Sequence, residues 1–332
     1  MRVTWPRVSL LLALAAFIAV DLYAMATYLV YDRLSATAAH CGGRFTNDTP
    51  ARFDTEGVSS EFAADDFDTT PYQMPDFRDV SFPSRDPRQP PLTIRAWWIP
   101  AARADAPAVI VVHGWGGCRR DPAILLPAGM LHRNSFSVLM IDMRDHGDSD
   151  VEDGRYAAGT EEYRDVLGAW DWLRAQGVPA ERIGLFGHSG GAPAVVMAMA
   201  SEPGVAATWE DSGDADIEEA LAEELARAGF PGWLTPGGLL WARLVAGDDL
   251  TGRNPLVETE RIGARPLEIV HGAADERISA HHARDLAAVR ARFVPGYEPW
   301  IVPGARHIEA PFSVPDEYER RLVTFFRESL GS

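Results

Sequence analysis

The residues best suited to chemistry lie in the segment Gly187 to Gly191, which reads GHSGG and places a serine between glycines. A G-x-S-x-G string alone is weak evidence, because it also arises by chance. Here it directly follows the apolar run 182–186 and precedes a run of small residues. A serine on a sharp strand-to-helix turn has a strained backbone, and glycines on both sides avoid collisions. We predict Ser189 as a nucleophile and the N–H of Gly190 as a donor to a substrate carbonyl oxygen.

A serine hydroxyl needs an imidazole to take its proton and a carboxylate to orient that imidazole. On a sheet with such a turn, the acid follows the serine and the histidine follows the acid. The segment 267–271 leads into a polar loop that contains Asp275, and the next apolar run leads to His307. We predict Asp275 as the acid and His307 as the base. Asp211 is the main rival for the acid, with Glu276 behind it.

The chain has nine histidines, so the choice of base rests on position. His307 alone lies after Asp275 on a loop that follows a predicted strand. The others are expected in the linker, in helices, in a turn or before the acid: His40, His113, His132, His146, His188, His271, His281 and His282.

A second glycine-rich loop, His113 to Gly117, reads HGWGG and directly follows the apolar run 108–112. Glycines there would let the backbone pass close to the serine. We predict the N–H of Trp115 as the second donor of an oxyanion hole, and His113 as a structural residue. The alternative is a turn that needs small residues and has no chemical role.

These loops require a parallel sheet with helices on both faces, and from Phe77 onward short apolar runs alternate with helical patterns. The predicted strands cover 77–82, 92–99, 108–112, 137–142, 182–186, 205–209, 267–271 and 297–302. The predicted helices cover 121–132, 160–175, 190–200, 280–291 and 314–329. Residues 214–255 break this rhythm and are typical of an inserted cap.

Four aromatic residues near the cap have two interpretations. They would line an apolar acyl pocket or, as is more common at such spacing, belong to the core. They are Trp209, Phe230, Trp233 and Trp241.

Together these motifs resemble the α/β-hydrolase superfamily, over about three quarters of the chain. The string from Asp142 to Ser149, D-x-R-x-H-G-x-S, resembles a turn in the bacterial dienelactone-hydrolase and prolyl-oligopeptidase-like branch. The resemblance implies an α/β-hydrolase fold: a mostly parallel, twisted sheet of about eight strands, helices on both faces and a small cap. It implies a buttressing role for Asp142, Arg144 and His146. Dienelactone hydrolases use a cysteine nucleophile, so that activity does not carry over.

Composition excludes several classes of function. The formal net charge is −17, and so acidic a surface repels nucleic acid. Ten Trp and fourteen Phe are too many for a disordered chain. Two cysteines, Cys41 and Cys118, cannot form a zinc site by themselves, although one disulfide is possible in an oxidising compartment. The serine chemistry predicted above requires neither a metal nor a cofactor.

The N-terminal residues 1–31 form a separate domain with two main interpretations, and a hydrophobic helix packed on a soluble domain is a third. Residues 8–31 are long enough, at about 24 residues, to span a ~30 Å hydrocarbon core, although Asp21 costs ~2.5–3.5 kcal/mol near the helix centre. Alternatively, Ala24-Met25-Ala26 fits the cleavage site of a signal peptide. We favour the anchor because apolar residues continue past that site. Both interpretations place residues 32–75, a linker or arm, and residues 76–332, the catalytic domain, outside the cytoplasm.

The sequence therefore predicts a serine hydrolase that cleaves carboxylic esters, thioesters or amides through an acyl-enzyme. Its substrate is a small acyl compound, and its membrane contact is the uncleaved N-terminal helix. A peptidase of the prolyl-oligopeptidase-like type is the alternative within this class, less favoured because the chain shows no propeller-forming segment. A membrane-tethered module without catalysis is the alternative from another class.

Overall fold

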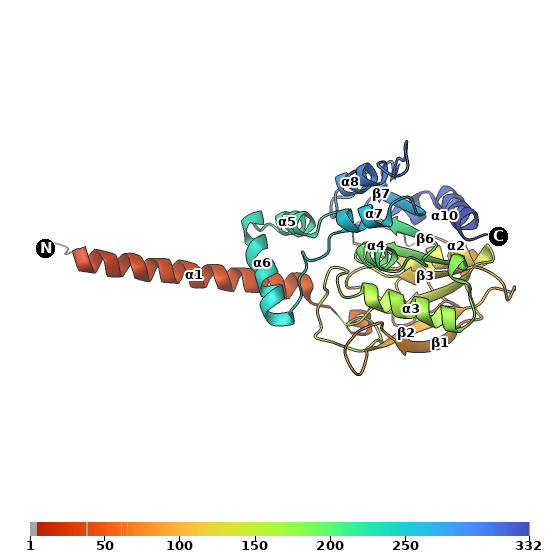
Figure 1. The fold of residues 1–332 in the computed structure, drawn as a ribbon, viewed down its shortest axis with the longest axis horizontal. Helices are drawn as coiled ribbons and strands as arrows, with labels where there is room; N and C mark the ends of the chain where they lie inside the picture. The colour runs from red at the N-terminus through yellow and green to blue at the C-terminus, as the bar shows by residue number, and fades with distance from the viewer. Residues whose placement is uncertain (1–4, 38, 61, 65, 332) are drawn as a thin grey trace.

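The computed structural model describes residues 5–37, 39–60, 62–64 and 66–331 (Figure 1). The first four residues of the predicted anchor, and residues 38, 61 and 65 of the predicted linker, lie outside this description. Helix α1 (Trp5–Ser35) projects from an α/β body that holds every other element.

The body is built on one eight-stranded sheet with the strand order β1-β2-β4-β3-β5-β6-β7-β8. Strands β1 and β2 pair antiparallel with each other, and β2 pairs antiparallel with β4, while the remaining pairs are parallel. The strands are β1 (Arg78–Pro83), β2 (Thr93–Ile99), β3 (Ala108–Val112), β4 (Ser137–Ile141), β5 (Ile183–His188), β6 (Ala207–Asp211), β7 (Leu267–Gly272) and β8 (Trp300–Val302).

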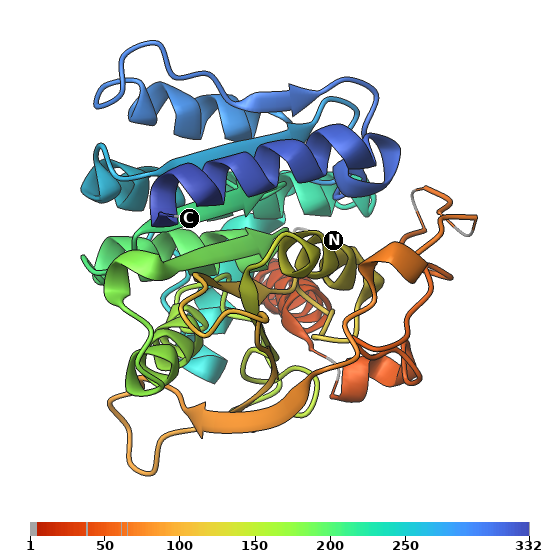
Figure 2. The same cartoon turned by 90° about the vertical axis from the view of Figure 1, so that its right-hand side faces the viewer.

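Helices cover both faces of this sheet (Figure 2). Helices α2 (Pro122–Arg133) and α10 (Pro315–Leu330) contribute to the core on one face. The other face is covered by α3 (Tyr163–Ala175), α4 (Gly191–Ser201), α7 (Pro255–Ile262) and α8 (His281–Arg290). Every residue of β3, β4 and β5 is buried, as expected of parallel strands enclosed on both sides. The short helix α9 (Ala310–Ser313) precedes α10.

The predicted eight strands and five helices are all present, with boundaries that differ by three residues or fewer. Helix α7 was not expected from the sequence. It begins after Asn254, whose side chain accepts a hydrogen bond from the N–H of Leu256, and Pro255 occupies its first position. An N-cap residue followed by proline is a start signal that would have indicated this helix.

The segment predicted as a cap joins β6 to α7. It contains α5 (Ile217–Arg227), the 3₁₀ turn η4 (Gly232–Leu234), α6 (Thr235–Trp241) and the π-helical turn η5 (Ala242–Ala246). Asp216 caps α5 by accepting hydrogen bonds from two backbone N–H groups of its first turn. Figure 1 shows α6 lying against α1, while α5 extends above it.

Helix α1 continues four residues past the boundary predicted at residue 31 and ends at Ser35. The stretch Val8–Ser35 is long and apolar enough to cross a membrane, with a mean hydropathy of 2.2. Its first two thirds are exposed, whereas Thr27, Val30 and Tyr31 are buried.

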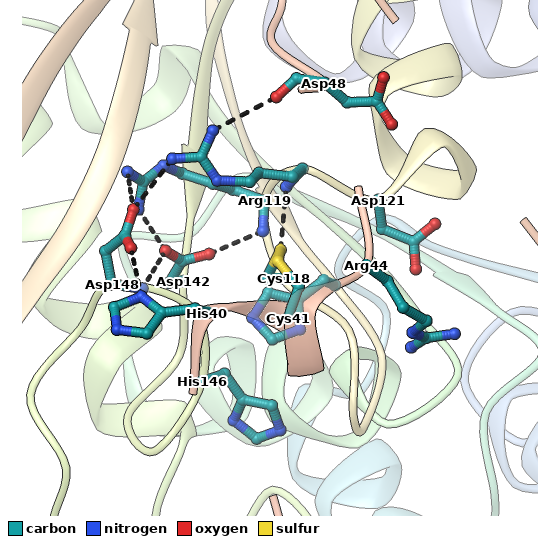
Figure 3. Close-up of a disulfide and its surroundings, with 12 residues drawn as sticks. His40, Cys41, Arg44, Asp48, Cys118, Arg119, Asp121, Asp142, His146 and Asp148 are labelled. Atoms are coloured by element: carbon teal, nitrogen blue, oxygen red, sulfur yellow. Dashed lines mark hydrogen bonds and ion pairs between the residues drawn. A yellow bond between two sulfur atoms is a disulfide. The ribbon is translucent and has the colours of Figure 1, made fainter. Parts of the chain in front are cut away.

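The described residues between 36 and 75 contain little regular structure beyond the 3₁₀ turns η1 (His40–Gly43) and η2 (Thr70–Tyr72). They are nevertheless packed on the body, since Phe53, Tyr72 and Met74 are buried within the core that α2 and α10 share. A disulfide between Cys41 and Cys118 holds this segment to the loop after β3, with the two Cα atoms 5.5 Å apart (Figure 3).

Candidate functional site

The predicted nucleophile sits on the turn between β5 and α4. Ser189 has a φ of 49°, in the left-handed region that few non-glycine residues adopt. A Cβ added to Gly187 would lie 2.4 Å from the carbonyl oxygen of Gly191, and one added to Gly191 would lie 2.5 Å from that of His113. Both glycines are therefore required by close backbone packing, which holds the serine in its strained conformation.

The structure brings Ser189, His307 and Asp275 together at the carboxyl edge of the sheet. His307 lies on the loop after β8, and its Nε2 is 2.8 Å from Ser189 Oγ. Its Nδ1 is 2.8 Å from a carboxylate oxygen of Asp275, on the loop after β7. With Nδ1–H donating to the carboxylate, Nε2 has a free lone pair for the serine proton. The three side chains can thus act as nucleophile, base and orienting acid.

Further hydrogen bonds fix the Asp275 carboxylate. One oxygen accepts from the N–H groups of Arg277 and Ile278, both at 2.9 Å, and the other lies 3.1 Å from His271 Nε2. Burial alone would raise the pKa of Asp275, but hydrogen bonds from His271 and His307 outweigh it and hold the pKa far below its usual range. The carboxylate therefore stays charged while it faces an imidazolium.

The rival acid has a different set of partners. Asp211, at the end of β6, accepts hydrogen bonds from the hydroxyls of Tyr318 at 2.5 Å and Ser212 at 2.8 Å. Its backbone oxygen accepts from the N–H of Ser189. Asp211 therefore stabilises the turn that carries Ser189. The geometry favours Asp275 as the acid, because Asp275 is the carboxylate next to His307 Nδ1.

The predicted oxyanion donors lie next to each other. A Cβ added to Gly190 would be 2.6 Å from the nitrogen of Trp115, and one added to Gly114 would be 3.0 Å from Ser189 Cβ. Within the described part of the chain, neither the Trp115 N–H nor the Gly190 N–H donates to a protein acceptor. Both are therefore available to a substrate oxygen beside the serine.

Two buried histidines support the loop that carries Trp115. His113 Nδ1 donates to the Gly114 oxygen at 2.8 Å, and His146 Nε2 accepts from the Gly116 N–H at 3.3 Å. Burial lowers the pKa of His113 to about 4 and that of His146 to about 3, so both rings are neutral at physiological pH. The two rings brace the loop, and neither contacts Ser189.

The disulfide lies beside the same loop (Figure 3). Arg119, which follows Cys118, pairs with the buried Asp142 and also with Asp148 at 2.8 Å. Arg44, from the segment that follows α1, donates to the Gly116 oxygen at 3.0 Å. The chain that leaves α1 is thus attached to the loop that carries Trp115 by a disulfide and a hydrogen bond.

A pocket opens above Ser189, and it contradicts the proposed acyl lining. Its walls come from the end of α1, the cap and the two catalytic loops: Val30, Leu34, Trp115, Tyr156, Ile217, Leu221, Leu225, Leu239, Leu250 and Ile278. None of the four aromatic residues considered from the sequence lines it. Trp209 is in the core, hydrogen-bonded to Tyr318, Phe230 and Trp233 are exposed, and Trp241 packs on α1.

Two polar residues that line this pocket were not predicted as site residues from the sequence. Tyr156 donates from its hydroxyl to the Gly190 oxygen at 2.6 Å and so holds the start of α4. Asp214 is buried at the base of the cap, with one carboxylate oxygen unpaired among the described residues. Burial raises the pKa of Asp214 to about 7. Neither residue sits in a motif, so no local signal identified them.

Glu219, His281 and His282 form a cluster whose ligand atoms lie within 4.8 Å of one another. It does not fit a metal ion, because His282 Nδ1 accepts a hydrogen bond from the Ala215 N–H. The proton of the neutral ring is then on Nε2, which faces Glu223 at 3.4 Å, so no lone pair is left for a metal.

Comparison with protein-family profiles matches residues 129–332 to the prolyl oligopeptidase family. The chain belongs to this family. The match covers well over half of the chain and includes Ser189, Asp275 and His307, while Trp115 lies before it. Membership establishes a serine hydrolase. A search among curated proteins found no match.

Solved structures show the same fold. An esterase from Pyrococcus furiosus is 22% identical over 80% of this chain and 96% of its own, with a TM-score of 0.64. The α/β hydrolase GrgF from Penicillium is 19% identical over 77% of this chain and 99% of its own, with a TM-score of 0.61. The acylaminoacyl peptidase of Pyrococcus horikoshii, 20% identical, aligns with 76% of this chain but only 41% of its own, with a TM-score of 0.55. The predicted α/β-hydrolase fold is thereby confirmed, as is the resemblance to prolyl oligopeptidases.

Proposed function

We propose that this family member hydrolyses carboxylic esters through an acyl-enzyme on Ser189. The observation that carries the proposal is the pair of 2.8 Å contacts that join Ser189 to His307 and His307 to Asp275. Ser189 Oγ attacks the acyl carbon while His307 Nε2 takes the hydroxyl proton. The N–H groups of Trp115 and Gly190 stabilise the oxyanion.

His307 then gives its proton to the departing alcohol oxygen. A water molecule attacks the acyl-enzyme with His307 again as base, which releases the acid and returns the proton to Ser189. Asp275 stabilises the imidazolium in both steps. Apart from that water molecule, every group named in these steps belongs to the site.

The pocket supports an ester rather than a peptide as the substrate. Its walls near Ser189 are mainly apolar and come partly from α1, which suits a hydrocarbon acyl group. A peptidase is the second candidate, and the family match is the observation that favours it. Matched p-nitrophenyl ester and p-nitroanilide substrates with one acyl group separate the two, and we expect the ester to be preferred.

Substitution of the nucleophile tests the proposal. We expect Ser189→Ala to lower kcat/KM for p-nitrophenyl esters roughly 10⁴-fold or more with the fold unchanged. Ser201→Ala, at the exposed far end of the same helix, is the matched control. Unchanged hydrolysis by folded Ser189→Ala would remove Ser189 from the mechanism.

We also propose that α1 is an uncleaved anchor and that the catalytic domain lies outside the cytoplasm. The disulfide supports an oxidising compartment. The contacts of Tyr23 with Trp233 and of Ala24 with Trp241 lie before the signal-peptide cleavage site, and they support a permanent helix. Detection of residues 8–24 in membrane-extracted protein by mass spectrometry would agree, whereas a mature chain beginning at Thr27 would refute the anchor.

A further inference from the structure

Helix α1 is both a segment of membrane length and a wall of the active-site pocket. Its large apolar side chains from Leu10 to Leu22 are about half exposed or more, with no covering element in the described structure. Further along the same helix, Val30, Tyr31 and Leu34 line the pocket above Ser189. One continuous helix therefore connects the hydrocarbon core to the catalytic site.

Helical geometry fixes how far the pocket lies from the bilayer. At 1.5 Å per residue, about 20 residues from Val8 span a ~30 Å hydrocarbon core and end near Thr27. The pocket-lining residues Val30 to Ser35 then lie roughly 5–12 Å beyond that edge, within or just above the headgroup layer. The wall of the pocket that α1 contributes is therefore close to the edge of the hydrocarbon core.

The cap contacts α1 at the last turns of this span, just before the pocket-lining residues. Tyr23 stacks on Trp233 with ring centroids 5.7 Å apart, and Trp241 donates from Nε1 to the Ala24 oxygen at 3.0 Å. Gly237 lets α6 approach closely, since an added Cβ would lie 2.4 Å from Thr27 Cγ2. Tryptophan and tyrosine concentrate at membrane interfaces, where this contact is expected to lie.

Exposed apolar side chains concentrate on the cap next to this contact. They belong to Phe230, Trp233, Leu240, Leu244 and Val245, each of which is 46–65% exposed. Outside α1 and the cap, the described residues include only three comparable side chains, Val151, Val257 and Phe293. A net charge of −17 gives no attraction to an anionic leaflet, so this apolar surface is what would hold the cap on a membrane.

The pocket itself suits a hydrocarbon chain. Its lining runs from Ser189 and Trp115 to Val30 and Leu34 of α1. The wall between α1 and the cap is apolar, through Leu34, Leu221 and Leu239. Glu224 and Arg277 provide charged groups at the lining, 3.9 Å apart.

We propose that the enzyme takes its substrate from the lipid bilayer: the exposed apolar surface of the cap rests in the leaflet that α1 enters, and a membrane-resident long-chain acyl ester passes between α1 and the cap to Ser189. This inference rests on the proposed ester hydrolysis and adds the substrate class and its source. Water supplies the hydroxyl of the released fatty acid and the hydrogen of the released alcohol.

The test compares two esters on the full chain reconstituted in phosphatidylcholine vesicles. One is water-soluble p-nitrophenyl acetate, and the other is p-nitrophenyl palmitate incorporated in the same vesicles. The test variant Leu240→Glu/Leu244→Glu places charges on the exposed cap surface, away from the pocket lining. The matched control Val257→Glu/Phe293→Glu places two charges on exposed apolar positions of the body.

We expect the rate of palmitate hydrolysis to be at least tenfold lower in the cap variant than in wild type. Its rate of acetate hydrolysis should be less than twofold lower. The control variant should change neither rate by more than twofold. Equal palmitate hydrolysis by wild type and cap variant, or an equal loss in both double variants, would overturn the membrane-substrate inference alone. If the wild type hydrolyses neither ester, the proposed function itself is wrong.

Discussion

The carboxyl edge of the sheet and the contact between α1 and the cap differ in what assembles them. At the sheet edge, each reactive residue lies on a short loop that directly follows a strand, and the order of the strands brings the loops together. At the other contact, Tyr23 and Trp233 meet across more than two hundred residues without any motif. The chemistry is thus encoded locally, whereas the pocket that selects the substrate depends on long-range packing.

After the loss of the nucleophile itself, the largest expected effect comes from the acid at the sheet edge. Asp275→Asn keeps the size of the side chain but loses the charge that orients His307, so kcat/KM should fall roughly 10³–10⁴-fold. Ester hydrolysis by folded protein measures it. Glu276→Gln is the matched control on the same loop. If kcat/KM falls less than tenfold in Asp275→Asn, or falls more in Glu276→Gln than in Asp275→Asn, the assignment of Asp275 as the acid is wrong.

The disulfide joins the segment that follows α1 to the loop after β3, and its removal should have the next largest effect. The double variant Cys41→Ser/Cys118→Ser leaves no free thiol and should lose about 2–5 kcal/mol of unfolding free energy, because the unfolded chain is no longer cross-linked. Thermal unfolding of the double variant is compared with that of wild type, and wild type is also measured with reductant. Equal melting temperatures for wild type and double variant would show that the bridge does not hold the segment after α1 to the loop.

Two neighbouring glycines on α6 test the contact between α1 and the cap. A methyl at Gly237 would press on Thr27 of α1, so Gly237→Ala should cost about 1–3 kcal/mol of stability. At Gly238 the nearest atom to an added Cβ is 3.8 Å away, so Gly238→Ala should instead stabilise the helix by about 0.5–1 kcal/mol. Chemical denaturation measures both. Effects of the same sign would mean that α6 does not pack on α1 as described.

The smallest expected effect is the pH dependence of stability that comes from Asp214, the buried carboxyl at the base of the cap. Because the folded pKa of Asp214 is about 7, above its unfolded value of 3.8, the folded state holds a proton that the unfolded state loses. The stability from Asp214 is complete below the unfolded pKa and is lost as the pH rises through about 7. In Asp214→Asn, the melting temperature should fall less between pH 5 and pH 8 than in wild type. Identical pH profiles would contradict the raised pKa.

The sequence was sufficient for the sheet, because buried parallel strands are continuous apolar runs. It also indicated the loops on which the five proposed site residues lie, because each loop carries a glycine motif or a polar ending. It was insufficient for the pocket. Trp233 and Trp241 belong to the contact with α1, and Tyr156 and Asp214 reach the site from loops without periodicity. Which aromatic residue faces which element is decided by tertiary packing, and no spacing rule reports it.

The central claim is that Ser189 is the activated nucleophile, and covalent labelling tests it most directly. Full-length protein in detergent is treated with a fluorophosphonate, digested and mapped by mass spectrometry, with Ser189→Ala and His307→Ala treated in parallel. We predict one phosphonylated residue, Ser189, with no labelling of Ser189→Ala and strongly slowed labelling of His307→Ala. Labelling of a different serine, or no labelling of a folded, ester-hydrolysing wild type, would contradict the claim.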